Sequence, residues 1–394
     1  MKRLEIIKQH LNSLEKEICI VAYGRSPIRR ALTDFSSISE SELAGQTLSQ
    51  VLKKYQINPK EVEEMYLGKV FTSNNGQAFY KQVLSSAGVG DHISGSTVNK
   101  LCASGMKAVS FGALSIACGH SECVVAGGVE KMGITPYILN LRKGIETKVK
   151  DTMFHDGFPD AVTKEPPIVI AEQFNKSQNY TLEDLNSYAN ISCTRAASAS
   201  KAGKFTEIVP IFIPKSSKKI IADSIKPLKV IEKSVPVLKN GINTAGNSCG
   251  TDDGASFVVL CTREKAQKCG WKVLGTIVSF ADGEQNAKLF PTSPSIAIKK
   301  ALKSANLNIN QVDYIELNEP FACVVLANSK ILNFPIEKIN VYGGAISLGH
   351  PLGSSGCRII GTLMSVLKQE GGNIGIAGIC NAGGGATAII VKKE

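Results

Sequence analysis

Two kinds of hydrophobic pattern alternate along the chain. Between positions 106 and 117 an apolar side chain recurs every three or four residues, at Met106, Val109, Ala113 and Ile116. This spacing predicts a helix with one buried face. The stretches 122–128 and 373–379 are instead short apolar runs that end in glycine or close to one, which is typical of buried strands. Strands that alternate with helices predict an α/β architecture.

The same pattern occurs twice. Three stretches of the first half have counterparts in the second, with 57–68, 102–114 and 122–128 resembling 307–318, 353–364 and 373–379. Gly105 aligns with Gly356, and the next aligned glycines, Gly127 and Gly378, follow after 22 residues in both halves. Matched stretches at matched spacing predict a duplicated strand–helix–strand unit, with each half of the chain built around its own sheet.

The pattern changes between the two repeats. Residues 165–169 read EPPIV, a helical stretch surrounds 170–202, and lysine and proline become frequent up to about position 240. We interpret this region as an inserted loop domain, where binding groups are often found. The predicted division of the chain is an N-terminal extension at 1–16, an N-terminal half at 17–131 to which 252–270 return, a loop domain at 132–251, and a C-terminal half at 271–394.

Composition argues against several classes of protein. The 394 residues contain no run of 18 apolar residues, so we expect no transmembrane helix and no membrane partner. The start of the chain lacks the apolar segment of a secretory signal. The net charge of +11 comes from lysines spread along the chain, and aromatic residues make up only 6%. This favours a solvated surface over nucleic-acid binding, although a polyanionic small ligand such as a nucleotide-containing thioester would also suit the charge.

Cysteine and histidine usage bears on metal binding and location. The eleven cysteines are odd in number and include no C-x-x-C, and the five histidines show no ligand spacing. We therefore expect neither a disulfide framework nor a metal site, and we expect a reducing compartment. A cytoplasmic location follows, with the mitochondrion as an open alternative, because the acidic residues Glu5, Glu15 and Glu17 argue only weakly against a transit peptide.

Four side chains could carry chemistry. Cys102 lies among small residues before a predicted helix, and either it is a small core residue or it is a nucleophile whose pKa is lowered by the helix N-terminus. His350 precedes the equivalent helix of the second repeat, Cys380 follows a predicted strand, and Asn318 follows another. Each alone could be structural: a satisfied histidine, a small strand-end residue, a turn former. Together they form a set suited to acyl transfer, with a nucleophile, two bases and an oxyanion donor.

At these residues the chain resembles the thiolases. The resemblance is carried by four ordered blocks, VNKLCASGMKA (98–108), NEPFA (318–322), GGAISLGHPLGSSGCR (343–358) and CNAGGGA (380–386). The segment TAGNSCG (244–250) is most similar to the biosynthetic branch, the acetyl-CoA acetyltransferases. The resemblance implies a five-layered αβαβα fold with an inserted loop domain and a homodimer or homotetramer. It also implies an acyl-CoA substrate and no further cofactor.

The resemblance also implies roles. Cys102 would be acylated, His350 would take its proton, Cys380 would remove the α-proton of a second acetyl-CoA, and Asn318 would hold a water beside His350 in an oxyanion hole. Backbone N–H groups of Cys102 and Ala382 would form a second oxyanion hole. The reaction would be ping-pong condensation of two acetyl-CoA to acetoacetyl-CoA, and its reverse. Residues expected to contact the acyl-CoA are Pro166, Lys226, Asn247, Cys249, Phe321, Ala382 and Gly383.

The chain departs from the thiolase pattern in ways that leave alternatives open. Pro166-Pro167-Ile168 replaces the usual His-Met-Gly, Cys249 replaces a serine, Ala382 replaces a glycine, and Pro320 removes a backbone donor. A 3-ketoacyl-CoA thiolase for longer chains is therefore one alternative. A degenerate thiolase that binds acyl-CoA or lipid without turnover is another. Cys380 argues against a ketoacyl synthase-like condensing enzyme, because such enzymes lack a second catalytic cysteine.

Overall fold

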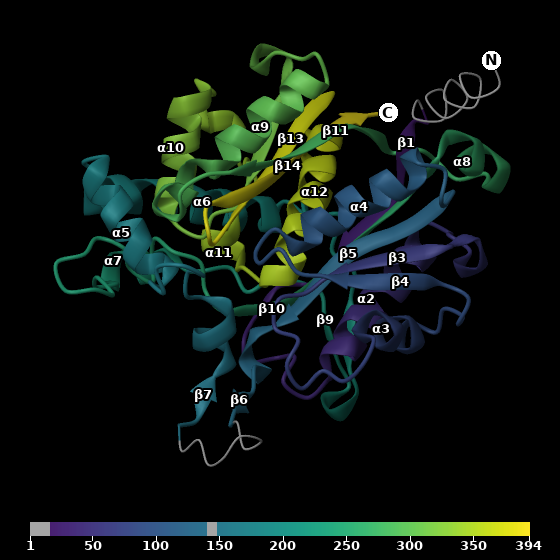
Figure 1. The fold of residues 1–394 in the computed structure, drawn as a ribbon, viewed down its shortest axis with the longest axis horizontal. Coiled ribbons are helices and arrows are strands. Elements are labelled where there is room, and N and C mark those ends of the chain that lie inside the picture. The colour runs from purple at the N-terminus through teal and green to yellow at the C-terminus, as the bar shows by residue number, and fades with distance from the viewer. Residues whose placement is uncertain (1–15, 140–147) are drawn as a thin grey trace.

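A computed structural model describes residues 16–139 and 148–394 (Figure 1). Residues 1–15, which make up most of the predicted N-terminal extension, lie outside the described residues. The main feature is a ten-stranded sheet in the order β12-β13-β14-β11-β1-β10-β5-β3-β4, with β2 paired to β10. The two predicted half-sheets are thus joined edge to edge through β1 and β11 into one continuous sheet.

The strands of the sheet and of two small hairpins have the following bounds: β1 Ile18–Arg25, β2 Arg29–Arg30, β3 Glu64–Gly68, β4 Ser94–Val98, β5 Cys123–Lys131, β6 Tyr137–Ile138, β7 Lys150–Asp151, β8 Ile211–Ile213, β9 Lys218–Ile220, β10 Asp252–Thr262, β11 Gly275–Glu284, β12 Tyr314–Leu317, β13 Ile374–Asn381 and β14 Gly385–Lys393. The helices are α2 Glu40–Lys54, α3 Phe79–Ala87, α4 Ser104–Ala117, α5 Pro167–Ser177, α6 Leu182–Lys201, α7 Leu228–Lys233, α8 Arg263–Cys269, α9 Ser293–Ser304, α10 Ala322–Leu332, α11 Ala345–Leu348 and α12 Leu352–Gln369.

The two halves are related by a pseudo-twofold axis at the β1–β11 junction. Ile18 pairs with Ile277 and Ile20 pairs with Gly275, symmetrically about Cys19 and its partner. On its other side β1 pairs with β10, and β11 pairs with β14. These two pairings are interrupted at equivalent places, since β1 has a bulge after Ile20 and β11 has one after Ile277. In each half a strand lies parallel to the strand after the central helix, β3 beside β5 and β12 beside β13. The predicted duplication is therefore confirmed.

Helices α4 and α12 form the central layer (Figure 1). They pack side by side and against strands of both half-sheets, while α2 and α3 cover the outer face of the N-terminal half and α9 and α10 cover that of the C-terminal half. The predicted apolar face of α4 is fully buried in the core between the half-sheets, at Met106, Val109, Ala113 and Ile116. These layers account for the five-layered thiolase-type α/β arrangement.

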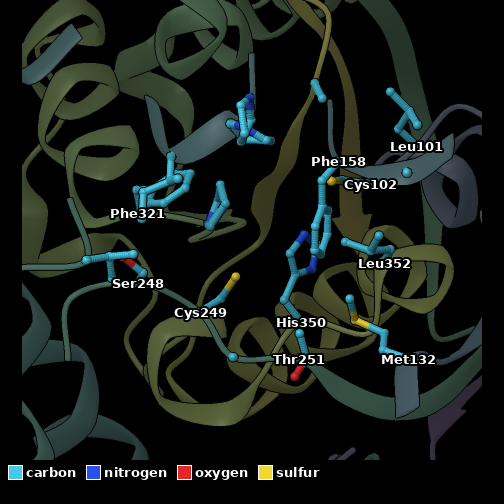
Figure 2. Close-up of a pocket in the computed structure, with 18 of the residues that line it drawn as sticks. Leu101, Cys102, Met132, Phe158, Ser248, Cys249, Thr251, Phe321, His350 and Leu352 are labelled. Carbon is cyan, nitrogen blue, oxygen red and sulfur yellow. The ribbon is translucent and has the colours of Figure 1, made fainter. Parts of the chain in front are cut away.

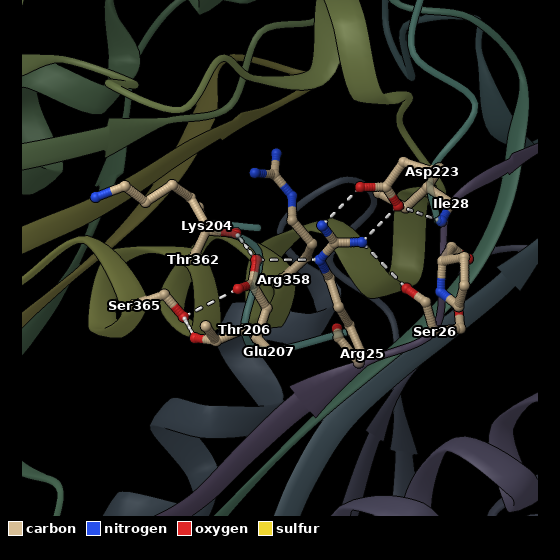
Figure 3. A network of polar contacts seen from close by, with 12 residues as sticks. Arg25, Ser26, Ile28, Lys204, Thr206, Glu207, Asp223, Arg358, Thr362 and Ser365 are labelled. Atoms are coloured by element: carbon tan, nitrogen blue, oxygen red, sulfur yellow. Dashed lines mark hydrogen bonds and ion pairs between the residues drawn. The ribbon is translucent and has the colours of Figure 1, made fainter. Parts of the chain in front are cut away.

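The segment between the halves packs on the C-terminal half through α5 and α6, and a buried polar network ties it to the sheet (Figure 3). Arg25, at the end of β1, donates to both oxygens of Asp223 at 2.7 and 2.8 Å. Glu207 accepts from Arg25 and from the Ser365 hydroxyl of α12. Arg25 and Glu207 are buried, so each charge is neutralised by the other residue of the ion pair rather than by water.

Two aligned glycines let the N-terminal ends of α4 and α12 cross in close contact. A Cβ on Gly105 would lie 2.5 Å from the carbonyl oxygen of Gly353, and one on Gly356 would clash with the backbone nitrogen of Met106. The obstacles are backbone atoms, which cannot move aside without shifting a helix. The glycines that revealed the repeat in the sequence are thus required by the contact between its two copies.

Gly105→Ala is expected to lower the free energy of unfolding by more than about 2 kcal/mol, because the added methyl group overpacks the helix crossing. Urea-induced unfolding measures this. Gly361→Ala on α12 is the control, since its Cβ would meet only Tyr23 at 3.6 Å and a helix-interior alanine stabilises by roughly 0.5–1 kcal/mol. Equal stability of the two variants would contradict the role of the crossing.

Candidate active site

Cys102 lies on a tight turn between β4 and α4. The preceding Leu101 has φ 51°, in the left-handed region that non-glycine residues adopt only where the surroundings require it. The Ser104 hydroxyl holds the turn, since it accepts the N–H of Lys100 at 2.8 Å and donates to the Leu101 carbonyl at 2.6 Å. The turn exposes Cys102 to a cavity just before the first residue of the helix.

His350 lies between α11 and α12, in the second copy of the same position. Its backbone N–H donates to the Asp252 carboxylate at 3.0 Å, and its Nδ1 is 2.6 Å from the Ser355 hydroxyl. That hydroxyl donates its one hydrogen to the carbonyl of Pro351 at 2.8 Å, so it must accept from His350 Nδ1. The imidazole therefore carries its proton on Nδ1 and leaves Nε2 free to accept one.

Asn318 follows β12 and faces the histidine. Its Nδ2 is 3.2 Å from His350 Nε2, and its backbone N–H donates to Gly378 on the neighbouring strand at 3.0 Å. The buried Oδ1 of Asn318 has no hydrogen-bond partner among the residues at 16–139 and 148–394. A buried acceptor of this kind fits a water or ligand donor beside the imidazole.

Cys380 lies near the end of β13, opposite Ala386 of β14, and is 1% exposed. Burial raises the pKa of its thiol well above the usual value, and Cys102 adds to this electrostatically. The turn that follows contains Ala382, which lines the cavity, and Gly383, whose φ of +90° requires a glycine or strains any other residue. The sheet thus brings the second thiol close to the first.

Cys102 and His350 face one cavity of about 370 Å³ (Figure 2), and Asn318 and Cys380 lie behind its wall. Most of the cavity wall is apolar and includes Leu101, Met132, Phe154, Phe158, Pro166, Pro167, Ile168, Phe321, Leu352 and Ala382. The side chains with a sulfur, nitrogen or oxygen atom on this wall include Cys102, Thr244, Ser248, Cys249, Thr251 and His350. A largely apolar cavity with a few convergent polar groups is typical of a small-molecule site.

Burial controls the protonation of the reactive groups. It raises the pKa of the Cys102 thiol to about 12, although the backbone N–H groups of Ala382 and of Cys102 itself act in the opposite direction. Burial and the nearby Arg358 guanidinium lower the pKa of His350 to about 3. We expected the helix N-terminus to lower the pKa of Cys102 and favour its thiolate. This prediction is wrong, because the loss of solvation raises the pKa more than the N–H donors lower it. The resting pair is a neutral thiol and a neutral imidazole.

Lys226 does not extend toward the surface. Its ammonium donates to the carbonyls of Ala245 at 2.7 Å and Ser248 at 2.5 Å, and burial lowers its pKa. The lysine thereby holds the loop that carries Cys249. Contact of Lys226 with a CoA phosphate stays a prediction, and the geometry favours a role inside the loop.

Asn247 also holds this loop together. Its Oδ1 accepts the N–H of Thr244 at 2.8 Å and its Nδ2 donates to the Ile242 carbonyl at 3.0 Å. Of the other residues expected to contact the acyl-CoA, the structure places four on the cavity wall: Pro166, Cys249, Phe321 and Ala382. Gly383 instead forms the turn beside it.

Sequence analysis missed two residues that orient His350. Ser355 sets its tautomer and Asp252 holds its backbone. Ser355 could have been found, because it lies five positions after His350 in the first turn of the predicted helix. Asp252 had no such signal, since the contact joins positions 98 residues apart. Within the described ranges no cluster of three or more His, Cys, Asp or Glu could hold a metal, and no helix there is long and apolar enough to cross a membrane.

Alkylation of Cys102 by iodoacetamide is expected to rise about tenfold per pH unit from pH 6 to 9 without levelling off, because only the thiolate reacts and the pKa is raised. Mass spectrometry of the peptide that contains Cys102 measures the rate, with Cys102→Ser as the control for assignment. A plateau near neutral pH would mean that the thiolate is already formed at rest.

Comparison with known proteins identifies the family. The models of the thiolase N-terminal and C-terminal domains match residues 18–264 and 271–393. A probable acetyl-CoA acetyltransferase from Dictyostelium discoideum is 39% identical over 100% of this chain and 97% of its own length, and acetyl-CoA acetyltransferase IA from Candida tropicalis is 40% identical over 95% and 97%.

Solved structures agree with this assignment. The Acat5 thiolase from Ascaris suum in complex with coenzyme A has a TM-score of 0.90 at 31% identity, covering 96% of this chain and 100% of that one. The Bacillus anthracis acetyl-CoA acetyltransferase has a TM-score of 0.92 at 32% identity, covering 96% and 99%. Both the fold and the sequence over nearly its full length show that the chain belongs to the thiolase family of acyltransferases.

Proposed function

We propose that the protein is an acetyl-CoA C-acetyltransferase, which condenses two acetyl-CoA to acetoacetyl-CoA and CoA and catalyses the reverse thiolysis. The observation that carries the proposal is the meeting of Cys102, Asn318, His350 and Cys380 where the two halves join. The similarity to acetyl-CoA acetyltransferases over nearly the full chain supports the substrate.

In the first half-reaction Cys102 attacks the thioester carbonyl. Its proton passes to Nε2 of His350, which the Ser355 contact leaves unprotonated. Because the resting thiol and imidazole are both neutral, this transfer accompanies attack rather than preceding it. The backbone N–H groups of Cys102 and Ala382 converge at the reacting sulfur and are placed to stabilise the oxyanion that forms beside it. The bond from carbonyl carbon to CoA sulfur then breaks.

In the second half-reaction Cys380 acts as the base. Its raised pKa keeps it protonated at rest, so it can give its proton to the departing CoA sulfur and become a thiolate. That thiolate takes the α-proton of the second acetyl-CoA, and the enolate carbon attacks the acyl group on Cys102. The Cys102 sulfur leaves and recovers its proton from His350. This order of steps is ping-pong covalent catalysis, and it uses no cofactor beyond the CoA substrates.

The loop at 166–168 bears on the length of acyl chain that the site accepts. Pro166, Pro167 and Ile168 line the cavity, where they stiffen the backbone and add apolar surface in place of a more polar sequence. This observation keeps the longer-chain 3-ketoacyl-CoA thiolase as the second candidate function. Binding of acyl-CoA without turnover is the outcome expected only if these residues block the site.

Thiolysis of acetoacetyl-CoA by the purified protein is expected to exceed that of 3-ketohexanoyl-CoA, and Cys102→Ala is expected to lose more than about 10³-fold of the activity because the covalent route disappears. Loss of the ketoacyl-CoA absorbance measures both. Faster cleavage of the longer substrate would favour the second candidate. Binding of both substrates without cleavage would refute thiolase catalysis.

Ser355→Ala is expected to lower kcat at least about tenfold with little change in KM, because general-base catalysis contributes on the order of 10² and needs the correct imidazole tautomer. Ser354→Ala is the matched control, since the Ser354 hydroxyl bonds Ser256 at 2.9 Å and not the histidine. Steady-state thiolysis compares the two. Equal losses in both variants would show that Ser355 is only a packing residue.

Assembly and location belong to the same proposal. Strand β4 has a described strand neighbour on one side only, β3, so its other edge is available to a second copy in a homodimer. Exposed apolar side chains around the β6–β7 hairpin, among them Tyr137 and Val149, would suit pairing of dimers into a homotetramer. All eleven cysteines are free, which supports a reducing compartment such as the cytoplasm.

A further inference from the structure

An ion cluster joins the two halves beside the active site. Lys100 Nζ lies 2.7 Å from one carboxylate oxygen of Asp282, and Lys107 Nζ lies 2.6 Å from the other. The Thr387 hydroxyl donates to Asp282 at 2.7 Å and accepts from Lys100 at 3.2 Å. All four side chains take part in a closed set of charge-assisted hydrogen bonds, which fixes geometry more tightly than a single surface ion pair.

The cluster is attached at both ends to catalytic backbone. Lys100 lies two residues before Cys102, and its N–H is held by the serine that shapes the turn. Its ammonium also donates to the carbonyl of Ala386 at 3.3 Å, and Ala386 is the residue of β14 that pairs with Cys380. Asp282 lies on β11, paired with Thr387 of β14. A single lysine thus connects the turn of one thiol to the strand partner of the other.

The two cysteines come from different halves of the chain, so no local structure sets their separation. Backbone hydrogen bonds fix Cys380 relative to Ala386 and fix Cys102 relative to Lys100. One link between these two pieces runs from Lys100 to Ala386, Thr387 and Asp282. Asp282 stays ionised because hydrogen bonds from Lys100 and Lys107 lower its pKa to about 2 despite partial burial, so the link is present throughout the working pH range.

We propose that Lys100, Asp282 and Lys107 form a clamp that sets the distance between Cys102 and Cys380. Lys100 and Asp282 are positioning residues, since neither lines the cavity. The inference rests on the proposed function, because it concerns the step in which both thiols act on one pair of substrates. Removal of the α-proton needs Cys380 in contact with the carbon acid beside acyl-Cys102. Acylation is less demanding, because Cys102 attacks with His350 as its base and Cys380 serves only as the proton donor to the departing CoA sulfur.

The test measures the two half-reactions separately in Asp282→Asn, which removes the shared charge and keeps the side-chain size. Acylation is followed as labelled acetyl group on Cys102 after rapid quenching. Carbon-acid chemistry is followed as exchange of acetyl-CoA α-protons in D₂O and as condensation. We expect acylation within about threefold of wild type and exchange and condensation reduced about tenfold to 100-fold, because small misplacements of reacting groups carry losses of this size.

Glu284→Gln is the matched control. Glu284 lies on the same strand, is 63% exposed and is 3.8 Å from Lys100, so its loss should leave both half-reactions unchanged. Lys100→Arg should restore part of the exchange rate lost in Lys100→Met, since it keeps the charge. If Asp282→Asn fails to fold, the comparison of Lys100→Arg with Lys100→Met tests whether the clamp sets the exchange rate.

Two results would overturn the clamp. Equal reduction of acylation and exchange in Asp282→Asn would mean that the cluster only stabilises the fold, and no reduction in either would mean that the thiols are spaced by other contacts. A wild-type protein that neither acylates Cys102 nor exchanges α-protons would instead refute the proposed function, and the clamp with it.

Discussion

The close crossing of α4 and α12 at Gly105 and Gly356 is the constraint on which the rest of the structure depends. The two helices begin at the same point of the repeat, so bringing their backbones into contact also brings together the residues just before them, Cys102 and His350. Larger side chains at either glycine would separate the two helix ends. The pseudo-twofold arrangement of the sheet and the composition of the site are therefore consequences of the same contact.

Buried carboxylates hold the chain segments around this crossing. The Glu130 carboxylate accepts the N–H groups of Val70 and Phe71 in the N-terminal half and of Gly353 at the start of α12. Glu319 acts similarly on the other side, where it accepts from Tyr188 of the inserted segment and from the N–H of Ile346. Each carboxylate is fully buried, and its charge is offset by several donors rather than by a solvent shell. Backbone contacts of this kind hold loops that carry few strand hydrogen bonds of their own.

Solvent exclusion accounts for the chemistry of the site. The same burial that keeps Cys102 and Cys380 as thiols keeps His350 as a neutral imidazole. A site of neutral groups avoids the free-energy cost of isolated buried charges. In the proposed reaction, the charge that forms would meet hydrogen-bond donors already in place. Proton positions are then set by hydrogen-bond partners, Ser355 above all, rather than by the solution pH.

The sequence by itself determined the duplication, the alternation of strands and helices, the buried face of α4, and the resemblance that singled out Cys102, Asn318, His350 and Cys380. These features depend on the periodicity and spacing of residues within short segments, and both can be read directly from the sequence. Tertiary structure alone decided the signs of the pKa shifts, the inward direction of Lys226, and the contacts of Asp252 with His350 and of Asp282 with Lys100. Burial and partners that lie 19 to 182 residues away set these properties, and no local pattern carries that information.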